Sequence, residues 1–171
     1  MTTGHSVSRD VELRTARLVL RAFRATDVED ARAYRDDPEF ARFLPHVPQP
    51  FTRADAEAFV VTNMNEPWET MPTFAVVREG RVIGTVNFQH IEGRSAMIGY
   101  AIGRASWGQG IAVEAAAAAI AWAWAEHDLD EIWASTAVAH VRSRRVMEKL
   151  GMVFEREAEG EVVYRLRRPR L

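Results

Sequence analysis

The N-terminal part of the chain changes from a two-residue to a helical period. Apolar and polar residues alternate over 17–23, which predicts a half-buried β-strand. A helix is expected from the N-cap Thr26–Asp27 to about residue 44, and the prolines of 46–50 end it because proline cannot continue a helix. A second helix is expected over 52–65, and it starts with capping-box spacing.

β-Branched and aromatic runs occupy the middle of the chain. They predict strands at 73–77, 81–91 and 96–103, joined by turns at 78–80 and 92–94. Links this short connect antiparallel neighbours. We therefore expect a three-stranded antiparallel unit here.

The C-terminal part alternates between helix and strand. It predicts a long apolar helix over 111–127, a strand over 131–138, a helix over 141–150, and a terminal hairpin of 153–156 with 161–166. The full order is βααβββαβαββ. The long helix connects two predicted strands, and a strand–helix–strand unit implies one parallel or splayed pair in a mostly antiparallel sheet. We therefore expect an α+β (mixed α/β) domain.

Composition and charge fit a single globular domain. The 171 residues are 47% hydrophobic and 27% charged, which suits one domain over 13–171 after a flexible arm over 1–12. The net charge of -2 gives no reason to expect nucleic acid or a membrane surface as partner. The N-terminus has no apolar signal-peptide core, and the apolar run 111–125 is too short to span a membrane. A cytoplasmic protein is expected.

Several kinds of chemistry are excluded by residue usage. The chain has no cysteine, so it has no disulfide, thiolate nucleophile or cysteine-bound metal. The five histidines show no metal-binding spacing, and no metal site is expected. Lys149 is the only lysine, which leaves one candidate for amine chemistry.

The segment 104–112 joins a predicted strand to the long helix and contains Gly108 and Gly110. Glycines at a helix N-terminus let an anion approach free backbone N–H groups, so this segment predicts a phosphate site. A Rossmann fingerprint is not met, because Val113 stands at its third glycine, and no Gly-Lys pair of a Walker loop exists. The residues 93–97 also lack the last glycine of a hydrolase G-x-S-x-G elbow.

Four motifs together resemble the GNAT N-acetyltransferase superfamily. They are the segments 107–112 (WGQGIA), 143–152 (SRRVMEKLGM), 15–21 (TARLVLR) and 98–100 (IGY). The last two are similar to the branch of ribosomal-protein alanine and serine N-terminal acetyltransferases. The similarity extends over about residues 13–168, and the predicted element order is that of the GNAT-like acyl-CoA N-acyltransferase fold.

The resemblance implies acetyl-CoA as co-substrate, without a metal. It implies that the CoA pyrophosphate rests on the glycine segment and that the pantetheine pairs with the end of the preceding strand. The cofactor-binding residues implied in this way are Ile102, Gly103, Arg104, Trp107, Gly108, Gln109, Gly110, Ile111, Ala112, His140 and Ser143.

The chain departs from the family pattern at three positions that bear on chemistry. Met97 stands where relatives often have a glutamate base, and Met147 where many have a tyrosine that protonates the thiolate. His140 replaces a common asparagine. Ser143 and Tyr100 are the remaining candidates for catalytic residues. The general base stays open among the polar groups near the predicted thioester site: Tyr100, His90, Glu92, and Asn87 with a bound water.

The function predicted from these residues is transfer of the acetyl group of acetyl-CoA to an amine by direct attack. We expect a protein or peptide α-amino group as acceptor. The alternatives are a small-molecule acetyltransferase acting on an antibiotic, polyamine or amino acid, and an acetyl-CoA-binding protein without turnover. The sequence leaves a homodimer open.

Overall fold

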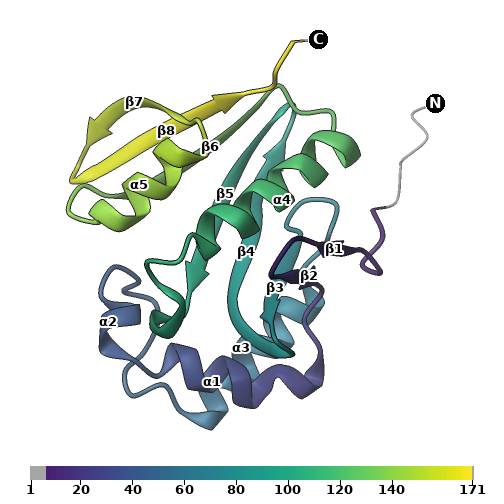
Figure 1. The fold of residues 1–171 in the computed structure, drawn as a ribbon, viewed down its shortest axis with the longest axis vertical. Helices are drawn as coiled ribbons and strands as arrows, with labels where there is room; N and C mark the ends of the chain where they lie inside the picture. The colour runs from purple at the N-terminus through teal and green to yellow at the C-terminus, as the bar shows by residue number, and fades with distance from the viewer. Residues whose placement is uncertain (1–6, 171) are drawn as a thin grey trace.

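The computed structural model describes residues 7–170, which form one twisted sheet of eight strands covered by helices on both faces (Figure 1). The strands are β1 (Glu12–Arg14), β2 (Val19–Arg21), β3 (Thr73–Arg78), β4 (Arg81–Glu92), β5 (Ser95–Ile102), β6 (Glu131–Ala137), β7 (Val153–Ala158) and β8 (Glu161–Arg167). The helices are α1 (Val28–Arg35), α2 (Pro38–Ala41), α3 (Arg53–Asn65), α4 (Ile111–Glu126) and α5 (Val141–Lys149). The strand order is β1-β2-β3-β4-β5-β6-β8-β7, and the predicted mixed α/β fold is confirmed.

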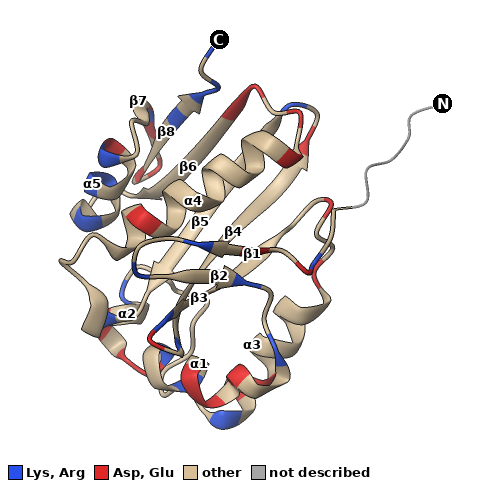
Figure 2. Ribbon diagram, turned by 45° about the vertical axis from the view of Figure 1, so that its right-hand side comes forward, with Lys and Arg blue, Asp and Glu red and all other residues tan. Residues whose placement is uncertain are grey.

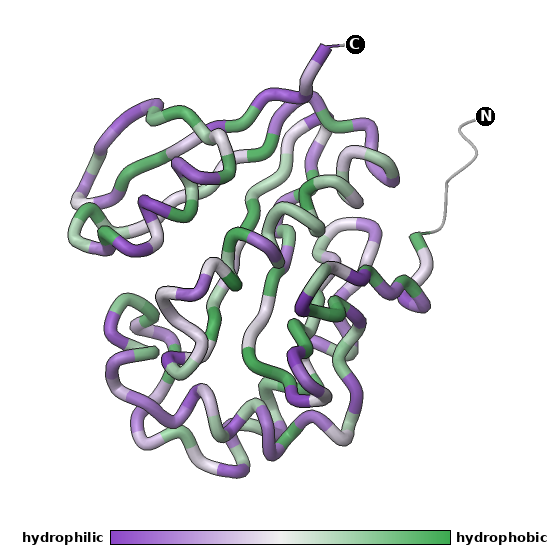
Figure 3. Tube along the Cα trace, viewed as in Figure 1, coloured by the Kyte–Doolittle hydropathy of each residue, from purple (hydrophilic) through white to green (hydrophobic). Residues whose placement is uncertain are grey.

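The two faces of the sheet pack against different helices because strand side chains alternate in direction. Phe74 and Val76 of β3 join the core under α4 and α5, whereas Ala75 between them packs against α1 and α3. Figure 3 shows the hydrophobic positions concentrated along the central strands and α4. The long apolar helix α4 is therefore buried between the sheet and its neighbours, as predicted.

The parallel pair of the sheet is short. β5 pairs with β6 only over residues 95–97 and 131–133. Beyond this ladder, residues 98–102 of β5 keep β4 on one edge and, within the described chain, pair with no strand on the other. This splay leaves backbone N–H and C=O groups of β5 facing a gap between β5 and α5.

The N-terminal elements differ from the predicted ones. The expected strand over 17–23 is shorter, as β2, and an additional strand β1 precedes it, because the chain reverses at residues 15–18 and pairs the two. Residues 1–6 of the predicted arm lie outside the described chain, and residue 12 already belongs to β1.

The single helix predicted up to residue 44 is a 3-10 turn followed by α1 and α2. The break lies at Asp36–Asp37, where Pro38 disfavours a helical conformation for the residue before it. Asp27 does not cap α1 with its side chain. Its carboxylate accepts instead from the Arg24 N–H at 2.7 Å and pairs with the partly buried guanidinium of Arg21 at 2.9 Å.

Within residues 7–170 no helix is both long and apolar enough to cross a lipid bilayer.

Candidate functional site

A cavity of about 490 Å³ lies where β5 separates from β6, and we call it the main cavity because it contains most of the predicted site residues. Its walls come from the end of β5 that does not pair with β6, the N-terminus of α4, helix α5, Phe40 of α2, and Leu44 just after α2. The lining residues are Phe40, Leu44, Tyr100, Ala101, Ile102, Ser106, Trp107, Gly108, Gly110, Ile111, Ala112, Val113, His140, Val141, Arg142, Ser143, Arg145, Val146 and Lys149. The splay of the sheet therefore creates a site of the size that small ligands occupy.

The glycine loop, residues 107–110, forms one end of this cavity. Gly108 and Gly110 have φ angles of 72° and 75°, which side chains rarely tolerate, and Gly110 is the N-cap of α4. A Cβ atom at Gly108 would meet nothing within 4 Å. The first N–H groups of α4 have no intrahelical acceptor, so the loop offers open space beside free donors at the positive end of a helix of 16 residues.

Trp107 is the first residue of the glycine loop, and its indole N–H donates to the Ile102 carbonyl oxygen at 2.7 Å. The Arg142 guanidinium lies 3.3 Å from the centre of the Trp107 ring. The side chain thus ties the loop to the end of β5 and to α5. It also occupies the Ile102 carbonyl, so the free carbonyl oxygens of β5 that face the gap lie earlier in the strand, at Ile98 and Tyr100.

Tyr100 and Ser143 meet on the cavity wall. The Tyr100 hydroxyl donates to the Ser143 carbonyl oxygen at 2.9 Å and lies 3.1 Å from Ser143 Oγ. Burial raises the pKa of Tyr100 to about 12, although the hydrogen bond to Ser143 opposes this shift. Tyr100 therefore keeps its proton at neutral pH, which argues against it as a general base.

Met147 packs beside this pair on α5 and is only 1% exposed. A thioether there fills the core and supplies no proton.

His140 caps the N-terminus of α5. Its Nδ1 accepts from the Ser143 N–H at 3.4 Å, and its ring stacks on Phe43 with centres 4.3 Å apart. Burial, together with Arg142 and Arg42, lowers the pKa of His140 to about 4. The imidazole is neutral at neutral pH, and with Nδ1 as acceptor it carries its proton on Nε2.

Three basic residues of α5 line the cavity: Arg142, Arg145 and Lys149. Figure 2 shows basic residues gathered on this helix. Sequence reasoning missed them, although their spacing of three and four residues places them on one side of a helix. They give the cavity the charge that suits a phosphorylated ligand.

Three of the residues predicted to bind cofactor do not line the main cavity. Gly103 and Arg104 line a second cavity of about 520 Å³, where Arg104 pairs with Asp37 at 3.4 Å. The Gln109 side chain accepts from Arg78 on the other side of the loop. The main cavity brings the other predicted site residues together: Ile102, Trp107, Gly108, Gly110, Ile111, Ala112, His140, Ser143 and Tyr100.

The other base candidates lie outside the main cavity. His90 and Glu92 are exposed at an irregularity in the pairing of β4 with β5. Asn87 Oδ1 lies 2.6 Å from the position of a Cβ on Gly99, on the face of β5 opposite to Tyr100. No group of three metal-ligating side chains exists in the part of the chain that the structure covers.

Comparisons with known proteins agree with this architecture. Residues 17–153 match the sequence profile described as Acetyltransferase (GNAT) domain. An uncharacterized N-acetyltransferase p20 from Bacillus licheniformis is 29% identical over 151 residues, covering 85% of this chain and 83% of that protein. The resemblance read from the sequence motifs is confirmed at the level of the family.

Solved structures show the same fold. A GNAT-family acetyltransferase from Bacillus anthracis superposes with a TM-score of 0.81 at 26% identity, covering 92% of this chain and 98% of that one. The ribosomal-protein-S5-alanine acetyltransferase of Vibrio fischeri gives a TM-score of 0.80 at 22% identity, covering 92% and 97%. The second protein comes from the branch that the N-terminal motif resembles.

Proposed function

The chain belongs to the GNAT acetyltransferase family and is an acetyl-CoA-dependent acyltransferase, and we propose that it acetylates the α-amino group of a peptide or protein. The observation that carries this proposal is the charge of the main cavity. Its described lining contains no Asp or Glu, while Arg142, Arg145 and Lys149 are all basic.

The residues of the cavity fit the co-substrate. The open side of the glycine loop and the N-terminal N–H groups of α4 suit a pyrophosphate, and the basic residues of α5 suit further phosphate oxygens. The free backbone groups of β5 that face the gap, which are the Ile98 carbonyl and the N–H and carbonyl of Tyr100, suit an extended arm that carries amides. Bound acetyl-CoA supplies an electrophilic thioester carbon and a thiolate that leaves readily. We place the pyrophosphate at residues 107–112 and the thioester arm along β5.

The protein supplies no strong base at this site. Tyr100 holds its proton because its pKa is about 12, and His140 is a weak base because its pKa is about 4. Met97 cannot accept a proton. The acceptor amine must therefore arrive largely neutral, with loss of its proton to water.

An α-amino group meets this requirement better than other amines. Its pKa of about 7.7–8.0 leaves roughly a third of the molecules neutral slightly above neutral pH, whereas about one lysine side chain in a thousand is neutral there. A polyamine is also a poorer fit, because the described lining of the main cavity offers no carboxylate to pair with its cations.

The acceptor panel tests the proposal directly. CoA release is measured with a peptide that has a free α-amino group, with the same peptide blocked at its α-amino group and carrying one lysine, and with spermidine. We expect kcat/KM to be highest for the free α-amino peptide by at least about tenfold, in line with the neutral fractions.

A preference for spermidine or for the blocked lysine peptide would overturn the acceptor assignment. Binding of acetyl-CoA in calorimetry without CoA release for any amine would indicate the non-catalytic binding protein instead. A cytoplasmic location remains a prediction from the sequence alone.

A further inference from the structure

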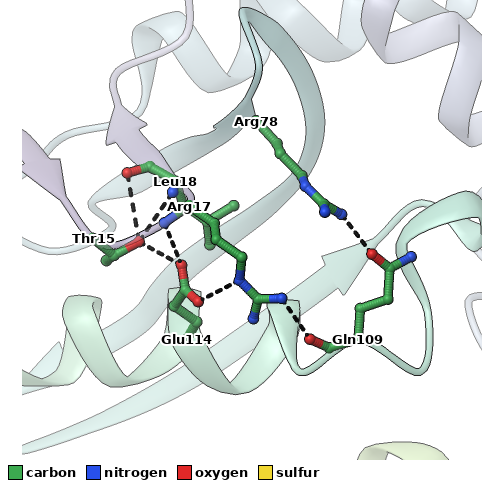
Figure 4. Close-up of polar contacts among 6 residues, drawn as sticks. All are labelled: Thr15, Arg17, Leu18, Arg78, Gln109 and Glu114. Carbon is green, nitrogen blue, oxygen red and sulfur yellow. Dashed lines mark hydrogen bonds and ion pairs between the residues drawn. The ribbon is translucent and has the colours of Figure 1, made fainter.

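Two arginines bind the glycine loop, and a glutamate binds one of these arginines (Figure 4). None of the three residues lines the main cavity. Arg17 Nη1 donates to the Gln109 carbonyl oxygen at 2.8 Å, and Arg78 Nη1 donates to Gln109 Oε1 at 2.7 Å. Arg17 Nε also binds Glu114 Oε1 at 2.8 Å. The hydroxyl of Thr15 and the backbone N–H of Arg17 donate to Glu114 Oε2 at 2.6 and 3.1 Å.

These contacts fix the orientation of one peptide unit. In a planar trans peptide the C=O and the N–H point in opposite directions. The Gln109 carbonyl points at Arg17, so the Gly110 N–H of the same unit points away from Arg17, and Gly110 lines the main cavity. Gly110 tolerates both signs of φ, so without this hydrogen bond the peptide is free to turn its carbonyl oxygen toward the cavity.

The same contacts set the charge behind the loop. Glu114 lies in the first turn of α4, where an unpaired carboxylate would repel a phosphate in the cavity. Burial would raise the pKa of Glu114, but hydrogen bonds from Thr15 and Arg17 outweigh burial and hold that pKa below its ordinary value. Arg17 pairs with this carboxylate, and Arg78 adds a further positive charge at the loop.

We propose that Arg17 is a positioning residue for the co-substrate: it directs the Gly110 N–H toward the CoA pyrophosphate and neutralises Glu114, without touching the ligand. The inference rests on the proposed function, because it takes the pyrophosphate to lie at residues 107–112. It assigns the N-terminal Thr15–Arg17 segment a role in substrate affinity in addition to folding.

The test compares two thioesters that differ in the group the loop binds. Arg17→Ala and Arg17→Lys are assayed in the full chain with acetyl-CoA and with S-acetylpantetheine, which lacks the pyrophosphate. We expect Arg17→Ala to raise KM for acetyl-CoA about tenfold with little change in kcat, the size of one lost charged hydrogen bond. For S-acetylpantetheine, kcat/KM should stay unchanged. Calorimetry with CoA and pantetheine provides the same comparison for binding.

Arg17→Lys should be intermediate, because a lysine keeps the charge but cannot bridge Glu114 and Gln109 as a guanidinium does. Arg14→Ala is the matched control: Arg14 ends β1 directly before the Thr15–Arg17 segment, pairs with Glu12 on the surface, and its variant should behave like the unaltered protein.

Equal losses of Arg17→Ala with both thioesters, or an unchanged KM for acetyl-CoA, would overturn the inference. Gly108→Ala separates this outcome from failure of the proposed site. If Gly108→Ala weakens CoA binding and Arg17→Ala does not, only the positioning role is wrong. If Gly108→Ala leaves CoA binding unchanged, the assignment of the pyrophosphate to the loop is wrong as well.

Discussion

Tyr100 of β5 and Ser143 of α5 form a polar contact in the wall of the main cavity, in which we place the thioester arm. The Tyr100 hydroxyl donates its hydrogen bond to the Ser143 carbonyl oxygen, so the Tyr100 oxygen can accept a hydrogen bond from the Ser143 hydroxyl. Because the pKa of Tyr100 is about 12, this arrangement does not change across the neutral range. The tyrosine thus orients the serine hydroxyl, and the pair works as one unit.

Removing either hydroxyl should have a moderate effect on turnover. We expect Ser143→Ala to lower kcat by about tenfold, or about 1.4 kcal/mol of barrier, since a CoA thiolate leaves without much help. Tyr100→Phe should cost a similar factor, and the double variant little more than either alone, because the two groups act together. Steady-state kinetics on folded variants measures this.

Multiplied losses in the double variant would show that the two hydroxyls act independently. A loss of 10⁴-fold or more for Ser143→Ala, about 5.5 kcal/mol, would instead identify the serine as an essential acid.

Sequence motifs located the residues of the loop and of the α5 N-terminus but not their contacts. The Trp107 indole donates to the Ile102 carbonyl, and its ring faces the Arg142 guanidinium. Residues 107 and 142 meet only because the fold brings the loop to α5. No local period or spacing contains that information.

At the scale of elements, CoA binding should depend most on the glycine loop. Gly108 and Gly160 both have left-handed φ angles, 72° and 80°, and a Cβ at either meets nothing within 4 Å. Gly108 lines the main cavity, whereas Gly160 lies in the turn between β7 and β8. The two positions form a matched pair for substitution.

Alanine at either position should lower the free energy of unfolding by about 1–2 kcal/mol, the cost of a left-handed residue. Only Gly108→Ala should also raise the Kd for CoA, because only its methyl group enters the ligand site. Denaturant unfolding and calorimetry separate the two effects. Equal CoA affinity of the two variants would contradict the loop assignment. Valine at Gly110 is a poorer test, since a β-branched residue at φ 75° adds strain of its own.

Elements with strong local signals were predictable. The α3 start is the expected capping box, with Thr52 Oγ1 accepting from the Asp55 N–H at 3.1 Å. The β3–β4 hairpin turns at Glu79 and Gly80, both in the left-handed region. The break between α1 and α2 was missed because helical spacing continues through it, although Pro38 marks it. The strand β1 was missed because three residues are too few for a periodic signal.

At the scale of the whole molecule, the sheet has two parts joined by the short ladder between β5 and β6. The proposed ligand lies in the gap beyond this ladder, between β5 and α5. A bound ligand therefore contacts both parts of the sheet where no strand pairing joins them. We expect binding to raise the free energy of unfolding of the whole domain, and not only the stability of one helix.

We expect CoA at about a hundred times its Kd to add about 2.7 kcal/mol to the free energy of unfolding, which corresponds to a rise in Tm of roughly 5–10 °C for a domain of this size. Amide hydrogen exchange should slow on both sides of the gap, in β5 and in α5. A rise in Tm without slower exchange in either element would show that the ligand binds elsewhere. Gly108→Ala should reduce the rise.

Lys149 in the lining of the main cavity has a chemical consequence of its own. Thioesters slowly acetylate lysine side chains without any enzyme, whereas guanidinium groups stay protonated and unreactive. With 21 arginines and this one lysine among its 22 basic residues, the protein is almost immune to such self-modification by its own substrate. This lysine lines the main cavity, where the phosphates of a bound ligand would pair with its ammonium group and keep it protonated, and a protonated amine does not attack a thioester.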